Sequence, residues 1–135
     1  MAFKNDGPQV NEYVYDFAVD GGAVSTIDLS AKQGFAPLPS GAVVKSVHYK
    51  VVSALTSGGS ATVSIGDANA TARYLALTAF DNAAYAAGNV AAAAIGVPMN
   101  VSAAARGQFG ISIAVAALTA GKIVFFVEFF QSAQE

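Results

Sequence analysis

The fold is decided by residues 41–66, GAVVKSVHYKVVSALTSGGSATVSIG. In the first half of this stretch apolar residues share one parity, with Lys45 and Ser53 as interruptions, which is the pattern of a strand with one buried face. The segment TSGGS at 56–60 favours a turn, and the alternation resumes after it. The stretch therefore predicts a β-hairpin. Its alternating positions are Val43, Val47, Tyr49, Val51 and Leu55 before the turn, and Ala61, Val63 and Ile65 after it.

The same pattern predicts two further hairpins, one on each side. Residues 13–20 alternate, a glycine turn follows, and 23–29 can form the return strand. Near the C-terminus, 109–117 and 123–129 alternate on either side of a predicted turn at 119–121. Each of the three regions is therefore expected to be an antiparallel strand pair.

These pairs indicate an all-β protein, an antiparallel β-sandwich or jelly roll of about eight strands. Glycine and proline punctuate 30–41, which is expected to be a loop. The alanine-rich segment 67–105 has no dependable period, although 73–80 can form a strand or a helical turn. A length of 135 residues is about one domain. We expect a single domain over 1–135, with a flexible N-terminal arm at 1–9.

Two five-residue segments echo each other. They are ALTSG at 54–58 and ALTAG at 117–121, and each precedes a strand with alternating apolar residues. Two hairpins that need similar turns are sufficient to explain this likeness.

The composition points to surface that is buried against a partner. Apolar residues make up 54% of the chain and charged residues 12%, about half the charged share of an ordinary soluble protein. We therefore expect a homo-oligomer. The net charge is -2 and the basic residues form no run, so nucleic acid is not expected as a ligand.

Several kinds of site and segment are excluded or disfavoured. The chain has no cysteine, and so can form no disulfide, thiolate zinc site or cysteine nucleophile. Its N-terminus lacks the apolar run of a secretory signal. The uncharged segment 82–105 is long enough to cross a bilayer, but its alanine, asparagine, glycine and proline content makes it a poor span. We expect no membrane partner.

The residues that could carry chemistry are scattered. His48, the only histidine, lies in mid-strand, where a structural role is expected. Residues 67–71, DANAT, begin like a calcium loop, but Ala72 and Thr78 replace its glycine and bidentate glutamate, so a turn held by side-chain hydrogen bonds is favoured. We expect no catalytic residue, metal or cofactor. A glycosidase pair is unsupported because the aspartates fall in different predicted elements: Asp16, Asp20, Asp28, Asp67 and Asp81.

The last predicted strand is apolar on both faces. Val124, Phe126 and Phe130 lie on the face opposite the main alternation, so this face is expected to be covered within the sandwich or by another subunit. These three residues are the candidate interface. Glu128, the one charged residue inside the strand, is expected to be solvated or paired. A catalytic role is not expected, since a lone carboxylate has no second acid or base at hand.

Three segments carry a resemblance to a known group of proteins: LPSGAVV at 38–44, GGSATVSIG at 58–66 and ALTAGK at 117–122. With the strands around them, over 20–130, they resemble small virion proteins of tailed bacteriophages, namely jelly-roll decoration or cement proteins and related head-fibre modules. The resemblance implies a non-enzymatic trimer, made in the host cytoplasm, that sits on the capsid exterior and holds neighbouring major capsid protein subunits together. It brings no active-site residues.

Two other functions stay open. A carbohydrate-binding β-sandwich would present exposed Tyr49, Tyr74 or Tyr85 beside a carboxylate or an asparagine. A tail or fibre component of the virion would share the sandwich and differ in copy number. An enzyme is the least favoured class, because no motif supports one.

Overall fold

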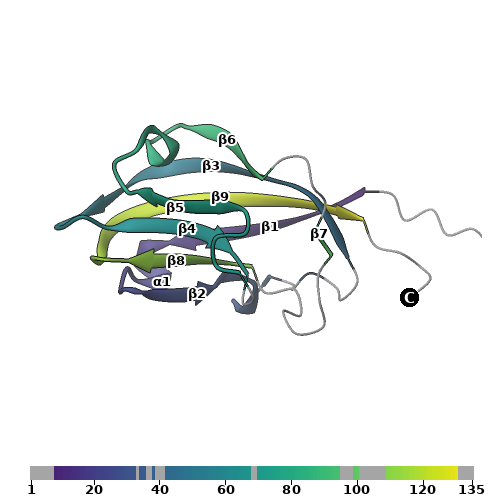
Figure 1. Ribbon diagram of the computed structural model, residues 1–135, viewed down its shortest axis with the longest axis horizontal. Coiled ribbons are helices and arrows are strands. Elements are labelled where there is room, and N and C mark those ends of the chain that lie inside the picture. The colour runs from purple at the N-terminus through teal and green to yellow at the C-terminus, as the bar shows by residue number, and fades with distance from the viewer. Residues whose placement is uncertain are drawn as a thin grey trace, which may run out of the picture.

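The computed structural model describes residues 8–32, 34–35, 38, 42–67, 70–94, 99–100 and 109–130. Two antiparallel sheets pack face to face as a sandwich (Figure 1). Sheet A has the strand order β1-β9-β3-β6, with the short β7 also paired to β3, and sheet B has the order β2-β8-β4-β5. The strands are β1 (Pro8–Asp16), β2 (Ser25–Asp28), β3 (Val43–Ser57), β4 (Thr62–Gly66), β5 (Leu75–Ala79), β6 (Val90–Ala94), β7 (Met99–Asn100), β8 (Gly110–Ala114) and β9 (Leu118–Phe130). The helical turns are α1 (Phe17–Asp20), η1 (Leu29–Ala31) and η2 (Ala83–Tyr85).

The pairing of the strands is that of a jelly roll. Apart from the two-residue β7, the first strand pairs with the last, the second with the next to last, β3 with β6 and β4 with β5. The chain is thus a long antiparallel ribbon rolled into two sheets of four main strands, as in double-sheet jelly rolls. The predicted all-β sandwich of about eight strands is confirmed.

The three predicted hairpins are wrong, although their strands exist. β3 and β4 lie in different sheets, as do β1 and β2, and β8 and β9. Each glycine- or alanine-rich connection is an arch that crosses the sandwich. Alternation shows that a strand has one buried face, but both sheets of a sandwich bury one face, so it does not say which sheet the strand joins.

Two predicted boundaries also differ from the structure. The first strand ends at Asp16, and Phe17–Asp20 turns into α1 because the Asp16 side chain accepts a hydrogen bond from the Ala18 amide at 3.0 Å. The turn expected at 119–121 lies inside β9, and the chain reverses at 115–117 instead.

The described parts of the alanine-rich region include three strands, β5, β6 and β7. Residues 75–79 form β5, in agreement with the strand alternative for 73–80. Further on, β6 adds to the edge of sheet A, where Val90 pairs with Lys50 and Ala92 with His48. β1 begins at Pro8 within the range of the predicted arm, and residues 1–7 lie outside the described part, so the arm stays a prediction.

The core lies between the two sheets and is rich in aromatic rings. Phe109 is at its centre, with ring centroids 5.0 Å from Tyr13, 5.6 Å from Tyr74 and 5.3 Å from Phe125. Nearly all of the alternating positions predicted in 41–66 are buried here, while Val43 is half-buried. The alternate residues that β1, β3 and β9 bury pack against buried residues of β4 and β8, and this burial holds the two sheets together.

Three arches gather at one end of the sandwich, the left end in Figure 1. The Leu118 amide donates to the Gly22 carbonyl at 2.8 Å, and the Ser57 hydroxyl donates to the Ala117 carbonyl at 2.7 Å. The two echoing segments, 54–58 and 117–121, lie side by side as neighbouring strands of sheet A. Among the described residues, no helix is long and apolar enough to cross a membrane.

Candidate functional site

The outer face of sheet A carries the predicted interface residues. In β9 the odd-numbered positions from Ile123 to Phe129 point into the core, so the even-numbered positions point outward. Phe126 is 38% exposed and Phe130 40% exposed, while Val124 is half-buried. No described part of the chain covers these two rings fully, so they remain open to a partner.

Other apolar side chains enlarge this face. Val10 of β1 is 56% exposed, and Val52 of β3 and Val90 of β6 are also exposed. One row of paired residues crosses the face from β1 to β6. Its members, in order, are Val14 on β1, Val124 on β9, Lys50 on β3 and Val90 on β6. In the described residues, five of the large hydrophobic side chains that are exposed belong to sheet A: Val10, Val52, Val90, Phe126 and Phe130.

Sequence reasoning found the β9 part of this face and missed the rest. Val52 follows from the parity of the predicted strand, because it shares its face with Lys50. Val10 precedes the predicted first strand. Val90 lies in the alanine-rich segment that gave no period, so no sequence signal placed it in sheet A.

The charged residues of this face are unevenly distributed. Lys45 lies 3.3 Å from Glu128, with its ammonium 5.8 Å from the centre of the Phe130 ring. This pairing confirms one of the two expectations for Glu128. Lys122 and Asp16 form a longer pair at 4.0 Å. Both ion pairs are partly exposed, so they contribute little to stability.

Three exposed charged or titratable residues on the same face form no ion pair within the described part of the chain. Glu12 lies on β1, and His48 and Lys50 lie on β3. Glu12 and His48 both pair with Phe126, from opposite sides. The charges without an ion pair are thus acidic on the β1 side and basic on the β3 side, and the apolar side chains between them on β9 are Val124, Phe126 and Phe130.

Sheet B presents a polar outer face with a small cavity of about 210 Å³. The Thr26 and Ser112 hydroxyls hydrogen-bond across β2 and β8 at 2.9 Å, and the buried Ser64 hydroxyl donates to the Thr71 carbonyl at 2.9 Å. Asp28 and Asp67 both line the cavity. The structure therefore brings together two of the five aspartates that the sequence left apart.

The two cavity carboxylates are engaged in structure. Asp67 accepts hydrogen bonds from the Ala70 amide at 2.9 Å and from the Arg73 guanidinium at 2.6 Å. Asp28 accepts from the amide and the hydroxyl of Ser30, and so caps η1. The predicted turn held by side-chain hydrogen bonds is confirmed. In the described ranges, no group of three or more histidine, cysteine, aspartate or glutamate residues could hold a metal ion.

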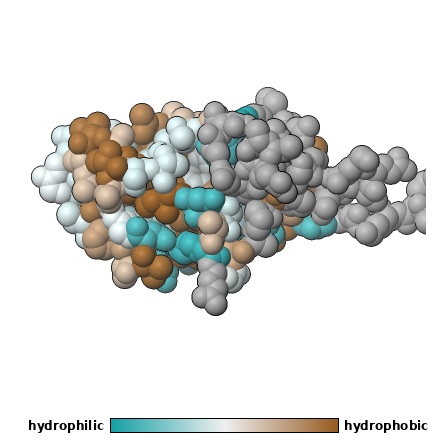
Figure 2. Space-filling model, turned by 90° about the horizontal axis from the view of Figure 1, so that it is seen from below, coloured by the Kyte–Doolittle hydropathy of each residue, from teal (hydrophilic) through white to brown (hydrophobic). Residues whose placement is uncertain are grey.

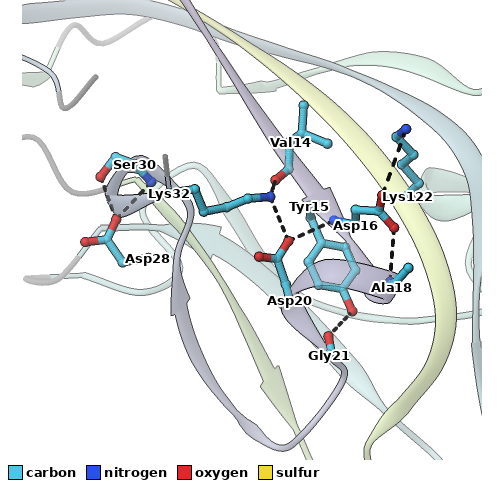
Figure 3. A network of polar contacts seen from close by, with 10 residues as sticks. All are labelled: Val14, Tyr15, Asp16, Ala18, Asp20, Gly21, Asp28, Ser30, Lys32 and Lys122. Atoms are coloured by element: carbon cyan, nitrogen blue, oxygen red, sulfur yellow. Dashed lines mark hydrogen bonds and ion pairs between the residues drawn. The ribbon is translucent and has the colours of Figure 1, made fainter. Parts of the chain in front are cut away.

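A second polar network joins β1 and α1 to the residue that follows η1 (Figure 3). Lys32 donates to the Val14 carbonyl at 2.6 Å and to Asp20 at 2.9 Å, and Asp20 also accepts from the Asp16 amide at 2.9 Å. The Tyr15 hydroxyl donates to the Gly21 carbonyl at 2.7 Å. Burial, together with the charges of Asp20 and Asp16, raises the pKa of Tyr15 to about 12. These contacts tie β1, α1 and η1 into one unit.

His48 and Asp81, the remaining candidates from the sequence, do not line the cavity that holds Asp28 and Asp67. His48 is exposed on the outer face of sheet A, whereas the cavity with the two aspartates lies on sheet B. Asp81 is exposed in the turn after β5. The arrangement therefore offers surfaces for contact, and it does not bring His48 to the carboxylates of the cavity.

The tyrosines expected to be exposed in a carbohydrate-binding protein are all buried. Tyr49, Tyr74 and Tyr85 are at most 5% exposed. The Tyr85 hydroxyl donates to the Val63 carbonyl at 2.8 Å, and burial raises the pKa of each of the three. None of them forms the exposed platform that the carbohydrate-binding alternative requires, because all three side chains are buried in the core.

The arch end is a third surface, and it carries two exposed apolar side chains among small and polar residues. Val24 precedes Ser25, which pairs with Ile113, so it lies beside the connection that carries Val115. Val24 and Val115 are both exposed. Figure 2 shows a brown, hydrophobic cluster at the left end of the molecule, where these two connections lie.

The comparisons with known proteins concern the fold. No protein-family model and no curated protein matches the chain. A chain in the capsid asymmetric unit of cyanophage Pam1 matches with a TM-score of 0.68 at 20% identity, over 98% of this chain and 93% of that chain. A chain in the acidic stable capsid of Helicobacter pylori bacteriophage KHP30 matches with a TM-score of 0.61 at 18% identity, over 92% and 87%. A chain in the capsid of Ralstonia phage GP4 matches with a TM-score of 0.53 at 18% identity, over 99% and 92%. Over nearly its whole length, this chain thus shares its fold with chains from three phage capsid structures.

Proposed function

We propose that the protein is a structural component of a phage capsid. The observation that carries this proposal is the match in fold, over nearly the full length of both chains, to chains in three phage capsid structures. The described residues add an exposed apolar face instead of a catalytic constellation. Burial of this face against neighbouring subunits requires no reactive group, so the proposed role is non-enzymatic.

Within the virion, the protein acts as a decoration or cement protein. It sits on the capsid exterior as a homotrimer and binds neighbouring major capsid protein subunits, as the sequence resemblance implies. The low charge of the chain supports this role, because contacts with several neighbours need surface that is free of unpaired charge. Small exposed residues at the arch end also allow close approach of a partner.

The experiment that tests this function measures the copy number of the protein in purified particles of the phage that encodes it. Quantitative mass spectrometry against the major capsid protein is expected to give hundreds of copies per particle. Labelling of intact particles with an antibody to the protein is expected to mark the outer surface of the head. Absence from the particles would refute a virion role, and a dozen copies or fewer would point to a tail, neck or fibre component.

Cement activity has its own test. Particles that lack the protein are expected to release their genome at a lower temperature than complete particles, and added purified protein should restore the higher temperature. The restored particles provide the control for damage during preparation. Equal release temperatures with and without the protein would contradict the cement role, while leaving decoration intact.

A further inference from the structure

We propose that copies of this chain associate through the outer face of sheet A, with the β1 side of one copy against the β3 side of the next. This inference rests on the proposed oligomer and states how its copies meet. The occupant of the face is a second copy of the chain, because the face is complementary to itself in charge and in its apolar centre.

The apolar part of the complementarity runs along the middle of the face. Phe126 and Phe130 are about two-fifths exposed and lie on β9, which has β1 on one side and β3 on the other. Val124 extends the same line. Rings that project from the central strand of a face are removed from water when a second such face packs against it.

The charges say how the second copy is oriented. Glu12 lies on the β1 side of Phe126, and His48 and Lys50 lie on the β3 side. A rotation axis that runs along the strands, whether two-fold or three-fold, brings β1 of one copy to β3 of the next and keeps each position along the strand. Glu12 therefore meets His48, with Lys50 two residues further along β3. A two-fold axis that lies in the face but runs across the strands brings β1 to β1 and acid to acid. Like charges at an interface are unfavourable, so the first orientation is selected.

The other charged residues of this face are already in ion pairs within one copy. Lys45 is engaged by Glu128, and Lys122 by Asp16. Glu12 and Lys50 lie two strands apart, about 10 Å at about 4.8 Å a strand. They form no ion pair within the described part of the chain. Each is therefore available to a neighbouring copy.

The face is large enough for a specific contact. β1 and β9 pair over nine residues, which is about 30 Å at about 3.4 Å a residue. Four strands are about 19 Å wide. The resulting flat area of about 570 Å² is of the same order as the ~800 Å² that each partner buries in a stable interface.

Charge reversal tests the orientation. Glu12→Lys and Lys50→Glu are each expected to weaken self-association by about tenfold or more, because each sets like charges against each other. An equimolar mixture of the two variants is expected to associate again, since the introduced lysine of one copy then meets the introduced glutamate of the other. Asp81→Lys, an equally exposed reversal in the turn after β5, is the control and should associate as the unaltered chain does. Mass by light scattering and sedimentation gives the readout, with circular dichroism to verify folding.

Cross-linking gives a second measurement that does not depend on weakened binding. The chain has no cysteine, so Glu12→Cys/Lys50→Cys provides the only thiols. Facing sheets lie about 10 Å apart, which is beyond the reach of a disulfide, so a bifunctional maleimide with an arm of about that length is expected to link separate copies. A link within one copy leaves the mass unchanged. The largest linked species gives the number of copies in the closed oligomer. Glu12→Cys/Asp81→Cys is the matched control and is expected to remain unlinked.

Three results would overturn the inference: a chain that is monomeric at all concentrations, charge reversals that leave association unchanged, or cysteines that fail to link copies. Particle binding separates this inference from the proposed function. A monomeric chain that still decorates particles refutes the inference and the proposed trimer, and leaves the virion role standing. An oligomer that links through these cysteines but is absent from particles refutes the proposed function alone.

Discussion

Gly22 is the residue at which the α1–β2 connection touches β9. Its carbonyl accepts the Leu118 amide at 2.8 Å, and a Cβ at this position would meet the Leu118 carbonyl and the Phe17 ring. Because the obstacle is backbone, relief requires the arch to shift. Gly22→Ala is expected to lower the free energy of unfolding by about 1–3 kcal/mol, as measured by urea denaturation.

Gly58→Ala is the matched control for that change. Gly58 lies in the β3–β4 arch of the same end, and nothing lies within 4 Å of the position that a methyl group there would take. The substitution is expected to leave stability unchanged or to raise it by up to ~1 kcal/mol, since alanine restricts the unfolded chain. Equal losses from the two substitutions would mean that the contact with Leu118 does not limit position 22.

Val115 has a backbone conformation that suits it poorly. Its φ is 72°, in the left-handed region, and its side chain is 74% exposed, so it gains little from packing. This conformation costs an L-residue about 1–2 kcal/mol, and asparagine tolerates it better. Val115→Asn is therefore expected to raise the melting temperature in calorimetry. Val115→Thr keeps the branched Cβ and should give no such gain. A lower melting temperature for the asparagine variant would show that the valine makes a contact that compensates for the strain.

At the scale of the element, the odd-numbered residues of β9 from Ile123 to Phe129 face the core, and the even-numbered ones face outward. Phe126 lies on its outer side, so Phe126→Asp is expected to leave the protomer folded and to dissociate the assembly. Leu77→Asp, on the exposed surface of β5 in the other sheet, is the control and should keep the assembly. Circular dichroism and light scattering distinguish the outcomes. Unfolding of the Phe126 variant would make that side chain part of a core, and an unchanged mass would place the interface on another face.

The strands were predictable because burial of one face leaves a period of two in the sequence, and their pairing was not. Residues 57–61 are rich in glycine and serine, which suits a hairpin and an arch equally. A tight two-residue turn would have favoured a hairpin, while the four-residue connection 58–61 is long enough to reach the opposite sheet. The partners of β3 include β9 and β6, which are distant from it in sequence, and local patterns carry no information about them.

The candidate interface could be predicted in part for the same reason. The second parity of β9 is apolar at Val124, Phe126 and Phe130, which alternation reveals without any partner strand. The charge pattern of the face could not be predicted, because it depends on β1 and β3 flanking β9. Glu12 and Lys50 are 38 positions apart in numbering and become members of one surface only through that pairing.

At the scale of the whole molecule, the two outer faces of the sandwich differ in kind. Sheet A is apolar along β9 and charged at its sides, while sheet B carries hydroxyls joined across its strands, as between Thr26 and Ser112. A molecule with one apolar face can bury that face against its own copies and keep the polar one in water. This asymmetry suits the proposed decoration role, since copies that bury one face against each other can close into an oligomer without further growth.

The whole molecule should also respond as a unit to alkali, because all of its tyrosines are buried. The chain has five tyrosines, and burial is the main cause that raises the pKa of each, to about 12 for Tyr15 and Tyr74. In the unfolded chain a tyrosine ionises near pH ~10. Since the folded pKa values are the higher ones, their contribution to stability is complete below about pH 10 and is lost as the pH rises towards about 12.

We therefore expect tyrosinate absorbance and loss of β-sheet circular dichroism to appear together, in one transition above pH ~10. Tyr49→Phe removes one ionisable group for which the described residues show no hydrogen bond, and should move the midpoint to higher pH. Tyr15→Phe also loses the hydrogen bond to the Gly21 carbonyl. This variant should therefore be less stable than the unaltered chain at neutral pH, although it also loses one group whose ionisation at high pH destabilises the fold. Tyrosinate that forms while the sheet signal persists would show that the rings reach water without unfolding, in contradiction to a closed aromatic core around Phe109.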